Sequence, residues 1–207
     1  TALLREYDLD FCCGGADTLG AAAAEKNLNL AEIEARLTEL QNSKKQDDEQ
    51  RWLTAPYADM INHIIHRYHE RHKQQLSELF DLAERVESVH GDRDDCPIGV
   101  AAEIQNIYAD LSSHMMKEEQ ILFPMIKMGN YAMARMPIQV MEHEHAEHGD
   151  HLEVLKSLTN NLTPPADACN TWRALYSGIQ EFMDDLMMHI HTENNILFPR
   201  VIEEGSR

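Results

Sequence analysis

The chain repeats one phrase of sequence, and this repeat limits the folds that it can adopt. HMMKEEQILFP begins at His114, and HIHTENNILFP begins at His189, 75 positions later. Two other segments match more loosely with a displacement of 76 positions, YHERH at 68–72 and EHAEH at 144–148. Nearly equal displacements in two pairs of segments indicate a duplicated helical hairpin, whose halves would meet across a pseudo-two-fold axis.

Four long stretches with helical periodicity contain these segments. They cover about 55–90, 98–127, 133–160 and 168–203, with turn signals at 91–97, 129–130 and 160–165 between them. Because the connections are short, consecutive helices should run antiparallel. We predict an all-α protein in which residues 52–207 form an up-down-up-down four-helix bundle.

A shorter segment precedes the bundle. Residues 1–42 contain a Cys-Cys-Gly-Gly turn, an alanine-rich stretch and a periodic run that ends at Leu40, and these features predict a small helical domain. The polar run from Gln41 to Arg51 is interpreted as a linker, or as the solvated end of a helix. The length of 207 residues fits one medium domain with one small companion.

Composition argues against several classes of partner. The chain has 36 acidic and 18 basic residues, a formal net charge of −18, and no basic block that could follow a phosphate backbone. No apolar run approaches the roughly 20 residues of a membrane-spanning helix, and the apolar start of a secretory signal is missing. Four cysteines, two of them adjacent, make a poor disulfide framework. We therefore predict a cytoplasmic protein that binds neither nucleic acid nor membrane.

Helical periodicity directs histidines and glutamates into the predicted core. The second and fourth helices each place one His-X-X-X-Glu pair inward. The first and third each place two histidines there, and periodicity does not choose between the two. These residues are His114 with Glu118, His189 with Glu193, His69 and His72, and His145 and His148. Buried imidazoles and carboxylates cost several kcal/mol when unpaired, so this number of them implies a shared metal.

The predicted donor set fits a pair of first-row metal ions. His at position i and Glu at i+4 lie one above the other, so both can reach one ion or two adjacent ions. Two such pairs, with one histidine from each remaining helix, exceed the four ligands of a structural zinc site. With no thiolate in the set, we predict two ions, each bound by two histidines and bridged by both glutamates. Open positions would remain for an oxo bridge and a small molecule.

The two repeated phrases, together with CCGG preceded by Tyr-Asp-Leu-Asp-Phe, closely resemble the bacterial repair-of-iron-centres proteins, over nearly the whole chain. The resemblance implies a cysteine-bearing N-terminal domain that usually begins somewhat before Thr1, followed by a hemerythrin-like bundle. It implies two iron ions with oxo and carboxylate bridges. It favours one histidine of each open pair and gives the ligand set His69, His114, Glu118, His145, His189 and Glu193, with both glutamates bridging.

The same resemblance implies that the protein helps to restore iron-sulfur clusters damaged by nitric oxide or peroxide, with damaged iron-sulfur proteins as clients. Iron donation from a labile site is the leading hypothesis. One alternative is nitric oxide reduction at the two irons. Another is a non-enzymatic protein that senses or stores oxygen, nitric oxide or iron. Oxygen-carrying hemerythrins place more histidines on one iron than on the other, a pattern that the matching His-X-X-X-Glu pairs do not follow. A homodimer is left open.

Three further residues are candidates for a direct role. Glu144, next to His145 at the rim of the inner face, could guide an ion or a proton, or could simply be solvated. Cys12 and Cys13 could receive iron, exchange thiols or react with nitric oxide, because exposed thiolates are soft nucleophiles. The plainer interpretation of the cysteines is a turn with incidental thiols.

Overall fold

The computed structural model describes residues 3, 7, 9, 18–41 and 47–207. Every regular element within these residues is helical, which confirms the predicted all-α class. No helix in this part of the chain is both long enough and apolar enough to cross a membrane. The predicted Cys-Cys-Gly-Gly turn, with Cys12 and Cys13, lies outside the described residues.

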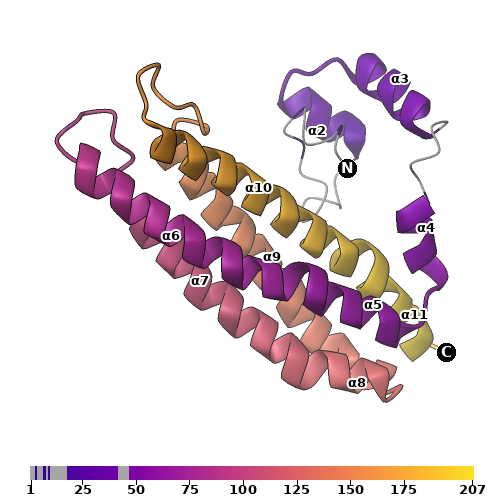
Figure 1. Ribbon diagram of the computed structural model, residues 1–207. Coiled ribbons are helices and arrows are strands. Elements are labelled where there is room, and N and C mark those ends of the chain that lie inside the picture. The colour runs from indigo at the N-terminus through magenta and orange to yellow at the C-terminus, as the bar shows by residue number, and fades with distance from the viewer. Residues whose placement is uncertain (1–2, 4–6, 8, 10–17, 42–46) are drawn as a thin grey trace.

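Four helical rods make up most of the structure, and they confirm the predicted bundle (Figure 1). Three rods are built from successive helical segments with no loop between them. The first rod is α5 (Tyr57–Ile64), η2 (Ile65–His69) and α6 (Glu70–His90), and the second is α7 (Val100–Lys117), η3 (Glu118–Leu122) and α8 (Phe123–Lys127). The third is α9 (Tyr131–Leu158) alone, and the fourth is α10 (Asn170–Thr192), η4 (Glu193–Leu197) and α11 (Phe198–Gly205).

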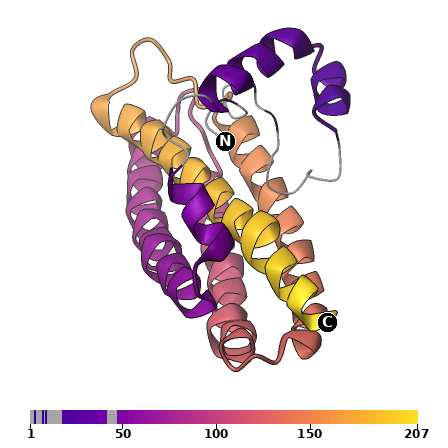
Figure 2. The ribbon, with the colours of Figure 1, turned by 90° about the vertical axis from the view of Figure 1, so that its right-hand side faces the viewer.

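Consecutive rods run antiparallel, in the predicted up-down-up-down order (Figures 1 and 2). α6 packs against α7 and α10, and α9 packs against α7 and α11. The first connection ends at Gly99, whose φ of 100° is readily adopted by glycine, and α7 begins at the next residue. The third connection turns through Asn160, Asn161 and Leu162, all with positive φ. The first of these connections places the second rod beside the first, and the third connection places the fourth rod beside the third.

The apolar core of the bundle is divided into two clusters. The larger cluster joins the C-terminal part of α6 to α7, α10 and the end of α9, and includes Ile104, Leu111 and Trp172. The smaller one joins α5, α8, α11 and the start of α9, and includes Met60, Phe123 and Phe198. The predicted histidines and glutamates lie along each rod between the segments that form the two clusters. A polar layer therefore crosses a bundle that is apolar on both sides of it.

Before the bundle, the described residues 18–41 and 47–54 contain three shorter helices: α2 (Leu19–Glu25), α3 (Leu30–Gln41) and α4 (Asp47–Thr54). Thr18 caps α2 by accepting a hydrogen bond from the N–H of Ala21, and Ala23 and Ile33 are buried in a separate small cluster. Residues 47–51, within the segment interpreted as a linker or a helix end, are helical. Arg200 of α11 donates hydrogen bonds to the carbonyls of Trp52 and Ala55, at distances of 2.7 and 2.8 Å, and so fastens this region to the bundle.

Replacing Ile104 by alanine should test the larger apolar cluster. Ile104 is fully buried, so the Ile104→Ala variant should lose about 2–5 kcal/mol of unfolding free energy through lost burial and a residual cavity. Ile98 is 54% exposed, and Ile98→Ala should change the unfolding free energy by no more than about 0.5 kcal/mol. Urea unfolding of the metal-free protein measures both. Equal losses in the two variants would contradict this assignment of the core.

Candidate metal centre

Three of the four rods change from α-helix to π-helix where they meet the polar layer. The π-helical segments have five residues each: η2 ends at His69, η3 begins at Glu118 and η4 begins at Glu193. A π-helical turn holds one more residue than an α-helical turn and so redirects the side chains that follow it. The segments η3 and η4 occupy equivalent places in the repeated phrases, so the duplication seen in the sequence extends to this irregularity.

Six buried side chains form two groups that share both glutamates. One group is His69, Glu118, His189 and Glu193, and the other is His114, Glu118, His145 and Glu193. Within each group the candidate ligand atoms lie within 4.8 Å of one another. All six residues are at most 1% exposed. The structure therefore brings together the residues that the sequence analysis assigned as ligands.

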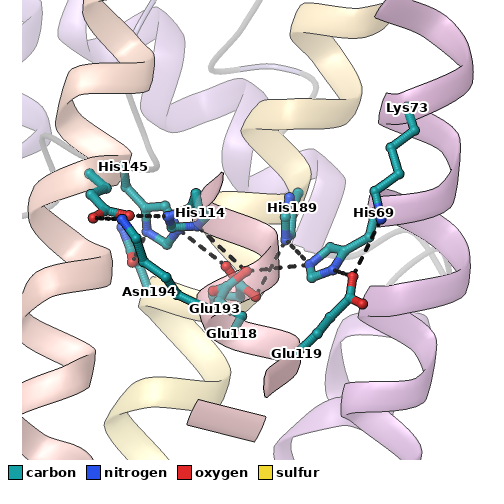
Figure 3. Close-up of polar contacts among 11 residues, drawn as sticks. His69, Lys73, His114, Glu118, Glu119, His145, His189, Glu193 and Asn194 are labelled. Carbon is teal, nitrogen blue, oxygen red and sulfur yellow. Dashed lines mark hydrogen bonds and ion pairs between the residues drawn. The ribbon is translucent and has the colours of Figure 1, made fainter. Parts of the chain in front are cut away.

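The two pairs of histidines lie on opposite sides of the glutamates (Figure 3). The Nε2 atoms of His69 and His189 are 3.2 Å apart, and those of His114 and His145 are 3.1 Å apart. Glu118 lies 3.4 Å from His69 and 3.5 Å from His114, measured from its Oε2 to each Nε2. Glu193 lies 3.2 Å from His145 and 3.3 Å from His189. Each carboxylate is thus positioned to bridge the two sides.

The carboxylates supply the test of whether a metal fits this site. Neither oxygen of Glu118 and neither oxygen of Glu193 has a hydrogen-bond partner, although all four are buried. A buried carboxylate with no donor costs several kcal/mol unless a cation lies beside it. Four imidazole nitrogens and two such carboxylates provide hard and borderline donors without a thiolate, which suits iron and related first-row ions. The residues fit a metal centre.

A second layer of side chains orients three of the four histidines. The Nδ1 of His69 lies 2.8 Å from Glu119 Oε1, and that of His145 lies 2.7 Å from Asn194 Oδ1. Because those oxygens accept a hydrogen bond from Nδ1–H, the neutral ring keeps the lone pair of Nε2 for a metal. Glu119 and Asn194 directly follow the two bridging glutamates in the repeat, so each repeat orients a histidine of another rod. Sequence reasoning missed both residues.

Glu144 orients the third of these histidines. Its carboxylate lies 2.9 Å from Nδ1 of His114 and forms an ion pair with Lys117, both on the neighbouring rod. Burial acts to raise the pKa of Glu144, but the hydrogen bonds from Lys117 and His114 outweigh it and lower the pKa. Glu144 also lines a pocket of about 510 Å³, whose wall includes Lys117 and His148. It therefore lies between one side of the site and solvent.

The histidines of the metal-free site have different proton affinities. Burial acts to lower the pKa of His145, but the Glu193 carboxylate, 3.2 Å from its Nε2, outweighs this effect and raises the pKa to about 9. The pKa of His69 is also raised, because Glu118 outweighs the effect of burial. Burial and the charge of His69 lower the pKa of His189 well below its ordinary value. His145 thus carries a proton at neutral pH and compensates the charge of Glu193.

His72 and His148 belong to neither group of candidate ligands. Each lies three residues after a histidine of the site, and each ring has a buried Nε2 without a hydrogen-bond partner. Burial lowers the pKa of both, that of His148 to about 2, so both rings are neutral. The α-helical periodicity could not separate them from His69 and His145, because positions three apart share a face.

Known proteins match this chain along nearly its whole length. The hemerythrin HHE cation-binding domain matches residues 60–201, and the ScdA_N domain, described as a domain of unknown function, matches residues 1–41. A "probable iron-sulfur cluster repair protein" of Haemophilus influenzae is 69% identical over 99% of this chain and 92% of its own length. The chain belongs to the repair-of-iron-centres family.

Other members of the family support the same assignment. The iron-sulfur cluster repair protein YtfE of Musicola paradisiaca is 58% identical over 98% of this chain and 90% of its own length. YtfE of Escherichia coli O81 is 54% identical over the same shares of the two chains. In this chain, all six buried histidines and glutamates of the site lie within residues 60–201, which match the hemerythrin domain.

Metal binding at neutral pH should release protons. The pKa of His145 is about 9, so His145 must lose a proton before its Nε2 can bind an ion. Titration calorimetry of the metal-free protein, in two buffers with different ionisation enthalpies, should detect the release of at least one proton per chain. The apparent affinity should rise with pH and level off above about 9. Binding without proton release at neutral pH would contradict the assigned protonation states.

Proposed function

We propose that this protein repairs iron-sulfur clusters damaged by nitrosative or oxidative stress, and that it donates iron from a non-haem di-iron centre in the polar layer. One observation carries the proposal: two buried carboxylates with no hydrogen-bond partner are shared by two pairs of imidazoles. The printed names of the relatives support the repair function. The clients are damaged iron-sulfur proteins, and the proposed location is the cytoplasm.

The donor set favours two ions over one. A single ion bound by all six residues would leave no open position, whereas two ions would each take two histidines and share Glu118 and Glu193 as bridges. When bound, such a pair of irons would supply ferrous–ferric redox chemistry and open positions for an oxo bridge and a small molecule such as nitric oxide, oxygen or peroxide. The residues of the chain hold and orient the ions.

Protonation of the ligands supports iron release. When an ion leaves, His69 and His145 can take up protons and so compensate the charges of Glu118 and Glu193. The raised pKa of His145 also stabilises the metal-free fold: this contribution is full below the unfolded value of 6.5 and is lost as pH rises through about 9. The empty site is therefore a tolerable state, as donation requires.

Glu144 and the N-terminal cysteines have proposed roles in this transfer. Glu144 lies between His114 and a pocket whose other carboxylates include Glu103, Asp110 and Glu147. An acidic pocket attracts cations, so we assign Glu144 to guiding an ion or a proton between His114 and solvent. Cys12 and Cys13 stay candidates for receiving iron or reacting with nitric oxide.

Metal content should depend on the two bridging glutamates. The wild-type protein should contain two irons per chain with the Mössbauer spectrum of a coupled pair. The double variant Glu118→Ala with Glu193→Ala should lose both irons, because each ion loses both of its bridges. The matched control is Glu181→Ala with Glu203→Ala, whose side chains are 61% and 71% exposed, and it should keep both irons. Zinc in the wild type, or no metal, would overturn the proposed function.

Isotope transfer should separate iron donation from nitric oxide reduction. Protein loaded with ⁵⁷Fe is mixed anaerobically with an iron-sulfur dehydratase that nitric oxide has inactivated. Donation predicts that activity returns and that ⁵⁷Fe appears in the rebuilt cluster. If activity returns while the label stays in the hemerythrin bundle and nitrous oxide accumulates, nitric oxide reduction replaces donation as the mechanism. Stopped-flow measurement of nitric oxide turnover provides the second readout.

A further inference from the structure

His72 is a third histidine on the His69–His189 side of the metal centre, with no role in the ligand set. It is fully buried, and its Nε2 has no hydrogen-bond partner. Its ring centroid lies 5.3 Å from that of His189, 6.2 Å from that of Tyr68 and 5.6 Å from that of Phe182. An imidazole nitrogen without a partner, enclosed by these rings beside a metal ligand, requires an explanation.

A chain of hydrogen bonds fixes which nitrogen of His72 carries the proton. Asp185 accepts hydrogen bonds from Arg67 at 2.6 Å and from the side-chain N–H of Gln75 at 2.9 Å. Because a carboxylate can only accept, the amide oxygen of Gln75 must face His72, where it lies 3.3 Å from Nδ1. Nδ1–H therefore donates a hydrogen bond to the amide oxygen of Gln75, and Nε2 of the neutral ring keeps a free lone pair. This is the tautomer of a metal-bound histidine.

His72 is held in this tautomer while its neighbour His189 is not. The Nδ1 of His189 is buried and has no hydrogen-bond partner. The other three histidines of the site bond through Nδ1 to Glu119, Glu144 and Asn194. Oriented histidines bind metal more tightly than unoriented ones. On the His69–His189 side, the candidate ligand His189 is therefore not oriented by a hydrogen bond, whereas the neighbouring His72 is oriented but has no place in the ligand set.

The equivalent histidine on the other side lacks this support. His148 packs edge-on against His114, with ring centroids 4.9 Å apart, and it lines the acidic pocket. The residue that corresponds to Gln75 is His151, and its two ring nitrogens lie 2.6 Å from Glu103 and 3.2 Å from Asp110. Because both nitrogens of His151 are engaged by carboxylates, it cannot orient His148 as Gln75 orients His72.

We propose that His72 is a reserve ligand for the metal ion on the His69–His189 side. When its ring turns toward the ion, the lone pair of Nε2 would bind the ion in place of a neutral exogenous ligand such as water, with no transfer of protons or electrons. The ion on this side is then retained, and the ion on the His114–His145 side leaves first. This inference rests on the proposed di-iron centre and adds which of the two ions is the exchangeable one.

The experiment compares chelator-driven metal loss from four holoproteins: the wild type, His72→Phe, Gln75→Leu and His148→Phe. The wild type should lose its irons in two phases. His72→Phe should accelerate the slow phase by about tenfold or more and leave the fast phase unchanged. Gln75→Leu retains the histidine but removes its acceptor, together with one hydrogen bond to Asp185, so it should accelerate the slow phase by a smaller factor. His148→Phe should leave the slow phase unchanged.

A spectroscopic readout identifies the bound ring directly. Loading the wild type with Co²⁺ should give a hyperfine-shifted, exchangeable proton NMR signal from Nδ1–H of His72, in addition to those of the ligands. His72→Phe should remove this one signal and keep the others, and retention of those others shows that the variant still folds.

Three outcomes decide between the proposals. In the first outcome the wild type binds two ions, His72→Phe and Gln75→Leu release metal at the wild-type rates, and His72→Phe loses no NMR signal. His72 is then only a packed core residue. In that case the inference fails and the di-iron centre stands. If acceleration is confined to His148→Phe, the order of release is the reverse of the one proposed. If the wild type binds no metal, the proposed function fails together with the inference.

Discussion

The lack of hydrogen-bond donors to Glu118 and Glu193 is the constraint on which the rest of the bundle depends. Two carboxylates are buried between apolar clusters, and four imidazoles lie beside them. Such a layer is tolerable when a cation fills it, as bound metal or as protons on His69 and His145. Because the apolar clusters on both sides exclude water, the charges of the two carboxylates must be compensated by metal or by protons.

Much of this arrangement could be predicted from the sequence, because the repeat and the apolar periodicity act together. The repeat located four helices and two inward His-X-X-X-Glu pairs, and the structure has both. Periodicity could not choose between His69 and His72, or between His145 and His148, because positions three apart share a helix face. The family resemblance favoured the first of each pair, and the structure groups those two with the glutamates.

Other features had no readable signal in the sequence. On one side of each π-helical segment the helix has at most eight residues, in α5, α8 and α11, which is too few to show a change of phase in the apolar pattern, so η2, η3 and η4 were not predicted. Glu119 and Asn194 occupy the same place in both repeated phrases, and this correspondence was the available clue to their shared task. Glu144 was predicted beside its sequence neighbour His145, yet it contacts His114, because contacts between rods depend on how the helices pack.

In the three rods that contain one, a π-helical segment also determines the rotation of one end of the rod relative to the other end. Each holds one residue more than an α-helical turn, and one residue rotates everything beyond it by about 100°. In the second and fourth rods, the segments beyond η3 and η4 carry Phe123 and Phe198 into the smaller apolar cluster. Deleting one residue there would restore a regular helix and turn these rings away from the core. The number of residues between each glutamate and the phenylalanine that follows it therefore decides whether that ring reaches the core.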